Sequence, residues 1–139
     1  MLFRSSPLGI ISSVNGTFSQ GGGQRPNWNG VSPTIDNPRP SRWLDASVFS
    51  TPAAYHFGNA PRTFNGTRSD WTRGVDLSLH KNTLITEKLR LQFRAEAFNL
   101  TNTPVFSPPN ISFGSPAFGT VSSMANQPRI IQLALKLLY

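Results

Sequence analysis

The side chains that carry most protein chemistry are scarce in this sequence and stand far apart. His56 and His80 are the only histidines, cysteine is absent, and neither histidine has an acidic pair at the spacing of a metal site. The carboxylates of the second half are isolated in the same way: Asp70, Asp76, Glu87 and Glu96. Acid–base catalysis needs two such groups placed together. We therefore expect no catalytic residue, no metal, no cofactor and no enzyme activity.

Signatures of phosphate and nucleic-acid binding are also missing. The glycine-rich stretch at residues 19–24, "SQGGGQ", is not followed by the Lys-Ser/Thr pair of a phosphate loop. Thirteen Lys and Arg against six Asp and Glu give a net charge of +7, but the basic residues are spread almost evenly along the chain. A nucleic-acid-binding surface usually concentrates its basic residues. We expect no nucleic-acid partner.

The richest set of polar side chains alternates with apolar ones in "LRLQFRAEAFNL". The polar members are Arg90, Gln92, Arg94 and Glu96, and the apolar members are Leu89, Leu91, Phe93, Ala95 and Ala97. A helix is the competing interpretation, because several of these residues favour helices and Thr86 is a suitable N-cap. On a helix, however, the apolar residues would spread around the axis, whereas on a strand they share one face. The pattern predicts a strand over residues 88–99.

Two further segments alternate in the same way. In "WTRGVDLSLHKN", Val75, Leu77 and Leu79 share one parity, and residues 82–87 are short enough for a turn. The pattern thus predicts a strand over 72–81 and a hairpin over 71–99. The closing segment, 128–139, is predicted to be a final strand with one apolar face: Ile131, Leu133, Leu135, Leu137 and Tyr139.

The remaining segments are rich in Gly, Pro, Asn and Ser, which favour loops. Residues 1–19 contain weak strand-like pieces, 20–70 form one long irregular segment, and 100–127 form another loop with an internal echo, Phe113-Gly114 and Phe118-Gly119. The long loop carries aromatics that either contact a ligand or pack the loop against its neighbours. These aromatics are Trp28, Trp43, Tyr55 and Phe57.

The length of the alternating segments matches that of strands that cross a bilayer, about 9–11 residues. One short turn between two long loops is typical of outer-membrane barrels, which have short periplasmic turns and long external loops. We therefore expect an all-β fold of antiparallel transmembrane strands, with the polar face toward the lumen and the apolar face toward lipid. Trp71 and Tyr139 are then candidates for the aromatic girdles.

Within such a barrel, Arg90, Gln92, Arg94 and Glu96 are the candidate lumen-facing residues. They either line a substrate path or satisfy one another by cross-strand pairing, and the second interpretation is favoured because barrel lumens are generally polar. Phe98 is the exception, since its parity places it on the polar face. A bulge near Asn99 or a packed lumen residue would explain it.

Three stretches carry a resemblance to a known family: "LRLQFRAEAFNLTNTPVF", "FGSPAFGTV" and "PRIIQLALKLLY". They resemble the C-terminal end of TonB-dependent outer-membrane receptors of the Oar-like, acidobacterial type, which belongs to the carboxypeptidase-regulatory-like domain family. Upstream, residues 42–82 resemble the last long external loop of that class and the strand after it. The resemblance covers roughly residues 25–139.

The resemblance implies a role in energy-coupled uptake of a large substrate through a 22-stranded barrel with a plug. It also implies outer-membrane lipid, the Bam assembly machinery and, through an N-terminal part, TonB as partners. The last strand, with its apolar residues from Ile131 to Tyr139, resembles the signal that Bam recognises. Residues 1–139 have room for only three or four strands, so we expect an incomplete barrel without export signal, plug or TonB box, a fragment that is not transport-competent alone.

A second class of protein is also compatible with this sequence. A secreted or surface β-domain would bind carbohydrate or protein through its aromatic-rich loops and would keep the alternating leucines in a water-soluble core. The two interpretations differ in what the apolar face meets. A charged residue at Leu91 or Leu135 is expected to harm membrane insertion only if that face meets lipid.

Overall fold

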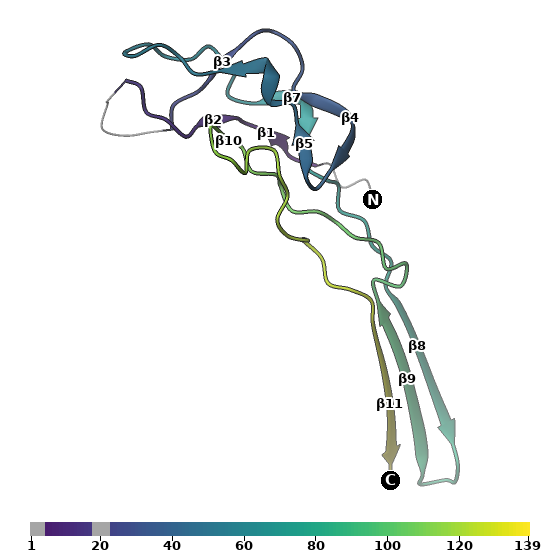
Figure 1. Ribbon diagram of the computed structural model, residues 1–139. Coiled ribbons are helices and arrows are strands. Elements are labelled where there is room, and N and C mark those ends of the chain that lie inside the picture. The colour runs from purple at the N-terminus through teal and green to yellow at the C-terminus, as the bar shows by residue number, and fades with distance from the viewer. Residues whose placement is uncertain (1–4, 18–22) are drawn as a thin grey trace. The chain divides into compact units, whose positions relative to one another are not determined.

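The computed structural model describes residues 5–17 and 23–139 of the chain. The fold is built from short and long β-strands with one turn of 3-10 helix, as Figure 1 shows. This confirms the predicted all-β class with antiparallel strands, although one short pair is parallel. No helix in the described part of the chain is long and apolar enough to cross a membrane. Residues 1–4 and 18–19 of the expected weak strand, and 20–22 of the glycine-rich stretch, lie outside the described residues.

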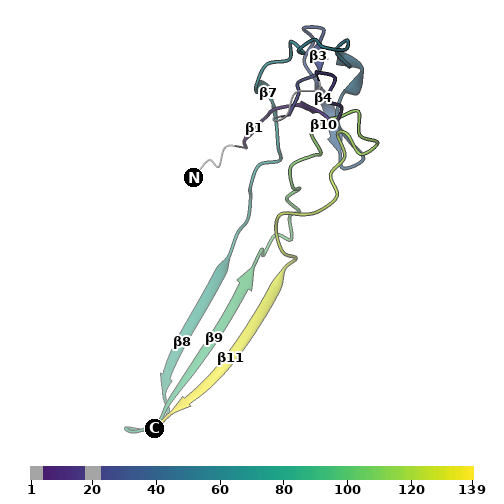
Figure 2. The same ribbon diagram turned by 90° about the vertical axis from the view of Figure 1, so that its left-hand side faces the viewer.

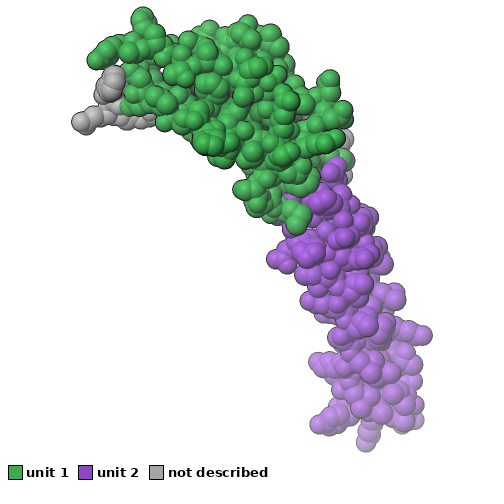
Figure 3. Space-filling model, in the orientation of Figure 1, with its two compact units in different colours: residues 1–71, 106–124 green, residues 72–105, 125–139 purple. Residues whose placement is uncertain are grey.

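The chain divides into two compact units, coloured separately in Figure 3. Unit 1 falls within Met1–Trp71 and Phe106–Met124, and unit 2 comprises Thr72–Val105 and Ala125–Tyr139. Each unit therefore takes two separate pieces of the sequence.

Unit 2 is a three-stranded antiparallel sheet of β8 (Leu77–Leu84), β9 (Arg90–Phe98) and β11 (Ile130–Leu138). The order is β11-β9-β8, so β9 lies in the middle, and the three strands run side by side in Figures 1 and 2. The helical alternative for residues 88–99 is thus wrong. A central strand pairs its backbone on both sides, and this context outweighs the helical propensity of its residues.

The hairpin boundaries differ from those expected. β8 begins at Leu77 rather than 72 and continues to Leu84, so residues 82–84 belong to the strand and not to the turn. The turn is closed by hydrogen bonds from the Ile85 N–H to the Leu89 carbonyl (2.9 Å) and from the Leu89 N–H to the Thr86 carbonyl (3.2 Å). The added pairs, ending at Leu84 opposite Arg90, bring β8 close to the length of β9.

Asn99 ends the sheet at the other side. Its backbone has φ 49°, a left-handed conformation that Asn tolerates better than most residues. Its N–H donates to Asp76 Oδ1 (2.9 Å), and its side-chain amide donates to the carbonyl of Gln127 (2.9 Å). One residue thereby joins the segments next to all three strands.

Unit 1 is assembled from short strands that pair two by two. They are β1 (Pro7–Leu8), β2 (Ile11–Ser12), β3 (Asn27–Trp28), β4 (Thr34–Arg39), β5 (Arg42–Leu44), β6 (Phe49–Ser50), β7 (Phe64–Arg68) and β10 (Ser112–Phe113). The antiparallel pairs are β1–β7, β3–β6 and β4–β5, and β2–β10 is parallel. The expectation of one irregular segment over 20–70 is wrong for residues 23–70, which contain five of these strands.

A hydrophobic core explains why this segment folds. The buried residues are Leu8, Ile10, Leu44, Val48, Phe49, Ala60 and Phe64. Phe49 contacts Phe64, Phe113 and Phe118 with ring centroids 5.7–5.9 Å apart. The Phe-Gly echo of the sequence thus supplies two rings that pack against the core, and Phe113 lies in the short strand β10.

The 3-10 helix η1 (Ala46–Val48) begins at Asp45, which acts as its N-cap. The Asp45 carboxylate accepts hydrogen bonds from the backbone N–H of Ser47 (3.1 Å) and from its hydroxyl (2.9 Å). These bonds, the backbone one first, lower the pKa of Asp45 from its ordinary 3.8 because they stabilise the charged form. An ion pair with Arg42 at 3.6 Å adds to the effect.

Candidate functional site

The ladder of unit 2 gives the sheet two different faces. Residues directly opposite one another in an antiparallel pair lie on the same face, so the register decides which side chains gather. On the apolar face, Leu79, Ala95 and Leu133 form one row, and Leu77, Ala97 and Ile131 form the next. In these two rows the apolar residues of all three strands therefore lie on the same face.

The apolar face is not covered within the described chain. Leu133 is 70% exposed, and Ile131, Leu135 and Leu137 are exposed as well. Lys81 and Thr83 interrupt this face near the turn, opposite Phe93 and Leu91. A lysine near the end of a strand can lay its alkyl stem on apolar surface and keep its ammonium group in water.

The other face carries the polar side chains. Ser78, Glu96 and Gln132 form one row, and His80, Arg94 and Ala134 form the next. Arg90 and Gln92 continue this face toward the turn. The register thus adds Ser78, His80 and Gln132 to the four residues singled out in the sequence, and strand parity combined with the observed register is the signal that finds them.

A connected polar cluster lies at the centre of this face. The Arg94 Nε lies 3.7 Å from Glu96 Oε1 and donates to His80 Nδ1 at 3.3 Å. Because Nδ1 accepts, we assign the neutral ring with its proton on Nε2, which then donates to Ser78 Oγ at 2.7 Å. His80 Nε2 also lies 3.9 Å from Glu96 Oε1. Arg94, Glu96 and His80 therefore restrain one another.

This arrangement corrects the expected cross-strand pairing of charges. The ion pair joins Arg94 and Glu96 of the same strand, and the neighbours that β11 places opposite them are the uncharged Ala134 and Gln132. Arg90 faces Leu84 and Leu138 across the ladder. Among the described residues, the cross-strand contacts of Arg94 and Glu96 within the cluster are those with His80.

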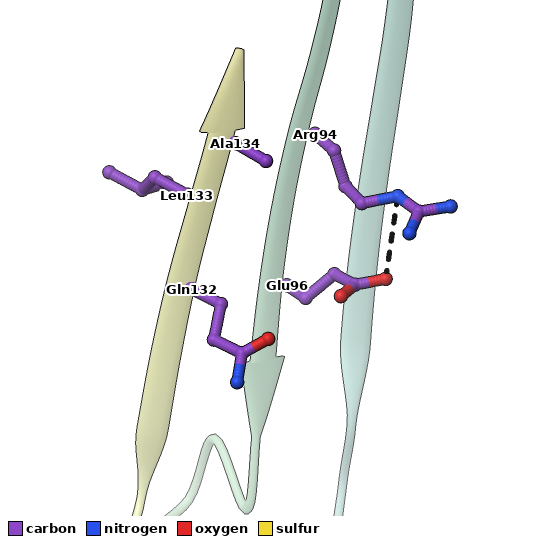
Figure 4. Close-up of a pocket in the computed structure, with 5 residues that line it drawn as sticks. All are labelled: Arg94, Glu96, Gln132, Leu133 and Ala134. Carbon is purple, nitrogen blue, oxygen red and sulfur yellow. Dashed lines mark ion pairs between the residues drawn. The ribbon is translucent and has the colours of Figure 1, made fainter. Parts of the chain in front are cut away.

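Beside the cluster lies an open hollow of about 410 Å³ lined by Arg94, Glu96, Gln132, Leu133 and Ala134. Figure 4 shows the Arg94 and Glu96 side chains extending from the same strand, with Gln132 reaching from β11 toward Glu96. The small Ala134 side chain leaves space next to Arg94. The hollow therefore presents guanidinium and amide donors together with carboxylate and amide acceptors.

Phe98 shares this face. The register runs without a shift from Leu138–Arg90 to Ile130–Phe98, so a bulge does not explain its parity. Within the described residues Phe98 is 42% exposed. That Phe98 packs inside the lumen of the closed barrel therefore stays a prediction.

The two candidates for the aromatic girdles, Tyr139 and Trp71, lie in different units. Tyr139 follows the last residue of β11, at the end of the sheet that holds the turn, and its side chain is exposed. Trp71 precedes the first residue of β8 by six positions and belongs to unit 1. Its place in the outer aromatic girdle therefore stays a prediction.

The aromatics of the long loop separate into two groups. Trp28 packs edge-on against Phe64 at 5.4 Å, and Trp43 against Phe106 at 6.0 Å. Tyr55 and Phe57 instead are 75% and 78% exposed. No group of three metal-ligating side chains occurs in the described part of the chain, and neither His56 nor His80 is placed in one.

Comparison with known proteins decides the family. The family model described as "Outer membrane beta barrel domain" matches residues 4–132, which is most of the chain. The chain belongs to the outer-membrane β-barrel domain family. No curated protein and no solved structure gave a significant match. As a member of this family, it is an outer-membrane protein, and its open three-stranded sheet is part of a barrel wall.

Proposed function

We propose that this chain supplies the closing strands of the barrel of a TonB-dependent receptor of the Oar-like type, and that the receptor takes up a large substrate by energy coupling. The observation that carries the proposal is the two-faced sheet of β8, β9 and β11, apolar without interruption along β11 and polar at the centre of the opposite side. The resemblance of "LRLQFRAEAFNLTNTPVF" and "PRIIQLALKLLY" to that class supports the finer assignment.

The apolar face meets outer-membrane lipid in this proposal, and the polar face lines the lumen. The nine residues of β9 or β11 extend about 30 Å at about 3.3 Å per residue. At a tilt of about 40° they span about 23 Å, close to the apolar band of about 25 Å in such barrels. The strands are thus of the right length to cross the membrane.

The connections give the orientation. The short turn between β8 and β9 lies at the same end of the sheet as Tyr139, and the long connections leave from the other end. Barrels place short turns in the periplasm and long loops outside. We therefore place the turn and Tyr139 at the periplasmic interface, and the segments of unit 1 outside the cell.

Further strands complete the wall. β8 and β11 each have an unpaired edge within the described chain, and such edges are very costly in lipid. The partners of this proposal are the remaining barrel strands and plug, the Bam machinery that adds β11 to a sheet edge by main-chain pairing, and TonB through an N-terminal part.

Uptake and location are tested together in the organism that carries the gene. Cells with and without the gene are compared for depletion of medium components, with and without a protonophore. The expected result is a gene-dependent uptake that the protonophore abolishes, and a protein that fractionates with the outer membrane. Gene-dependent passage that persists in de-energised cells would show a passive pore and overturn the energy coupling.

A surface β-domain that binds carbohydrate or protein is the second candidate. The exposed side chains of Tyr55 and Phe57, in a unit with its own hydrophobic core, favour it. In the outer-membrane protein it predicts that Tyr55→Ala or Phe57→Ala weakens binding of a carbohydrate or protein ligand to the cell surface. Unchanged ligand binding in both variants rules this candidate out.

A further inference from the structure

Phe98 is the aromatic ring among the large apolar side chains that the register places on the polar face, which also include Ile130, Leu84 and Leu138. Phe98 follows Arg94 and Glu96 at alternate positions of β9, so the three form a strip about 14 Å long on one face. The ring is 42% exposed and lies directly opposite Ile130. An exposed ring in a polar wall loses the free energy of burial unless something apolar covers it.

The polar part of the strip is electrically balanced. Arg94 and Glu96 form an ion pair at 3.7 Å, so a ligand with a net charge gains attraction from one and repulsion from the other. The remaining cations of this face, Arg90 and Lys136, lie toward the turn, in the direction away from Phe98. The strip from Arg94 to Phe98 therefore favours an uncharged ligand.

The hydrogen-bonding groups are of mixed kind. Arg94 offers only donors, Glu96 only acceptors, and the Gln132 amide offers both. These groups line the same hollow of about 410 Å³. A hydroxyl group is both donor and acceptor, so a ligand with many hydroxyls can use all three side chains at once. A site built around such bonds discriminates strongly against analogues that lack them.

We infer that the strip Arg94–Glu96–Phe98, together with Gln132, is a binding site for a neutral saccharide chain. The hydroxyls of one sugar unit bond to the planar side chains of the hollow, and the apolar face of the next unit stacks on the Phe98 ring. The inference rests on the proposed function for the place of this face in the lumen. It names the substrate class that the lumen wall recognises.

The test uses the complete protein purified in detergent from outer membranes. Three six-sugar probes differ in charge: cellohexaose is neutral, hexagalacturonic acid is anionic and the chitosan hexamer is cationic. Titration calorimetry is expected to show binding of cellohexaose that does not change with NaCl concentration. Preferred binding of a charged hexamer, weakened by salt, would overturn the inference, as would no binding of any probe.

Variants locate the site. Phe98→Ala and Gln132→Leu are each expected to weaken cellohexaose binding about tenfold, and Phe98→Tyr to retain it. Phe57→Ala removes a more exposed aromatic ring from unit 1 and serves as the matched control, with unchanged affinity expected. Loss of binding in Phe57→Ala but not in Phe98→Ala or Gln132→Leu would place the site in unit 1 and refute the proposal.

The two proposals fail separately. Energy-dependent uptake without any saccharide binding would remove the saccharide inference and leave the receptor assignment intact. Cellohexaose binding that depends on Phe98, in a protein whose uptake is unaffected by the protonophore, would support the saccharide inference and remove the energy-coupled receptor assignment. Heat-modifiable migration of each variant checks that its barrel is folded.

Discussion

Leu133 of β11 is the direct cross-strand neighbour of Ala95 of β9, while Gln132, one residue earlier, is the neighbour of Glu96 on the opposite face. Leu133→Arg is therefore expected to cost about 2–4 kcal/mol of folding free energy in the membrane, because the cation enters the lipid face near the middle of the strand. Gln132→Arg, which places the same cation opposite Glu96, is the matched control. The amount of heat-modifiable protein in outer membranes measures both variants, and equal losses would contradict the assignment of the Leu133 face to lipid.

Phe49 and Phe57 separate core packing from surface exposure in unit 1. Phe49 is buried among Phe64, Phe113 and Phe118, so Phe49→Ala is expected to destabilise the unit by about 3–5 kcal/mol. Phe57→Ala removes an equal ring that is mostly exposed and is expected to change stability by less than about 0.5 kcal/mol. Hydrogen exchange of residues 43–50 reports the difference, and similar exchange in both variants would contradict the observed core.

Gly58 and Gly66 test a close backbone approach. A Cβ at Gly58 would collide with the backbone carbonyl oxygens of Arg25 and Pro26, whereas one at Gly66 would meet nothing within 4 Å. Gly58→Ala is expected to cost about 1–3 kcal/mol, and Gly66→Ala to be nearly neutral. Limited proteolysis of the 51–63 segment measures the effect. Equal resistance of the two variants would mean that the segment does not pack on residues 25–26.

The lowered pKa of Asp45 predicts that the local stability around the 3-10 helix depends on pH. Its pKa is lowered in the folded state, so its contribution to stability is complete above the ordinary value of 3.8 and is lost as the pH falls through the lower folded value. Asp45→Ala is expected to cost about 1 kcal/mol at neutral pH by removing the cap, and Asp45→Asn to keep the cap without the acid dependence. Exchange rates of the Ser47 amide between pH 5 and pH 2 check this, with a comparison to Asp45→Asn that corrects for the intrinsic rate. Identical pH profiles for the unaltered protein and the Asp45→Asn variant would contradict the role of the carboxylate.

The strands of unit 2 were predictable because each repeats one face over many residues. The start of β8 was not predictable, since the alternation of Leu77 and Leu79 continues back to Val75, before the first residue of the strand. β9 decides the boundary, because it ends at Phe98 and Asn99 turns away with φ 49°. A strand ends where its partner ends, and that information is not local.

The candidate site was also predictable only in part. Parity placed Arg94 and Glu96 on one face, but only the register shows that Ala134 and Gln132 stand opposite them and leave the hollow. In unit 1, strands of two to six residues are too short to show a period. Its core is made of contacts between distant residues, such as Phe49 with Phe113, which no window of sequence contains.

The parallel pairing of β2 with β10 sets an order of events during biogenesis. Ser112 and Phe113 pair with Ile11 and Ser12, and residues 72–105 are synthesised between them. Two of the three ring neighbours of Phe49, Phe113 and Phe118, are therefore synthesised only after the whole hairpin. Until then, the segment before the hairpin lacks the rings that complete its aromatic core, and exposed apolar surface of this kind makes a partly folded chain prone to aggregation.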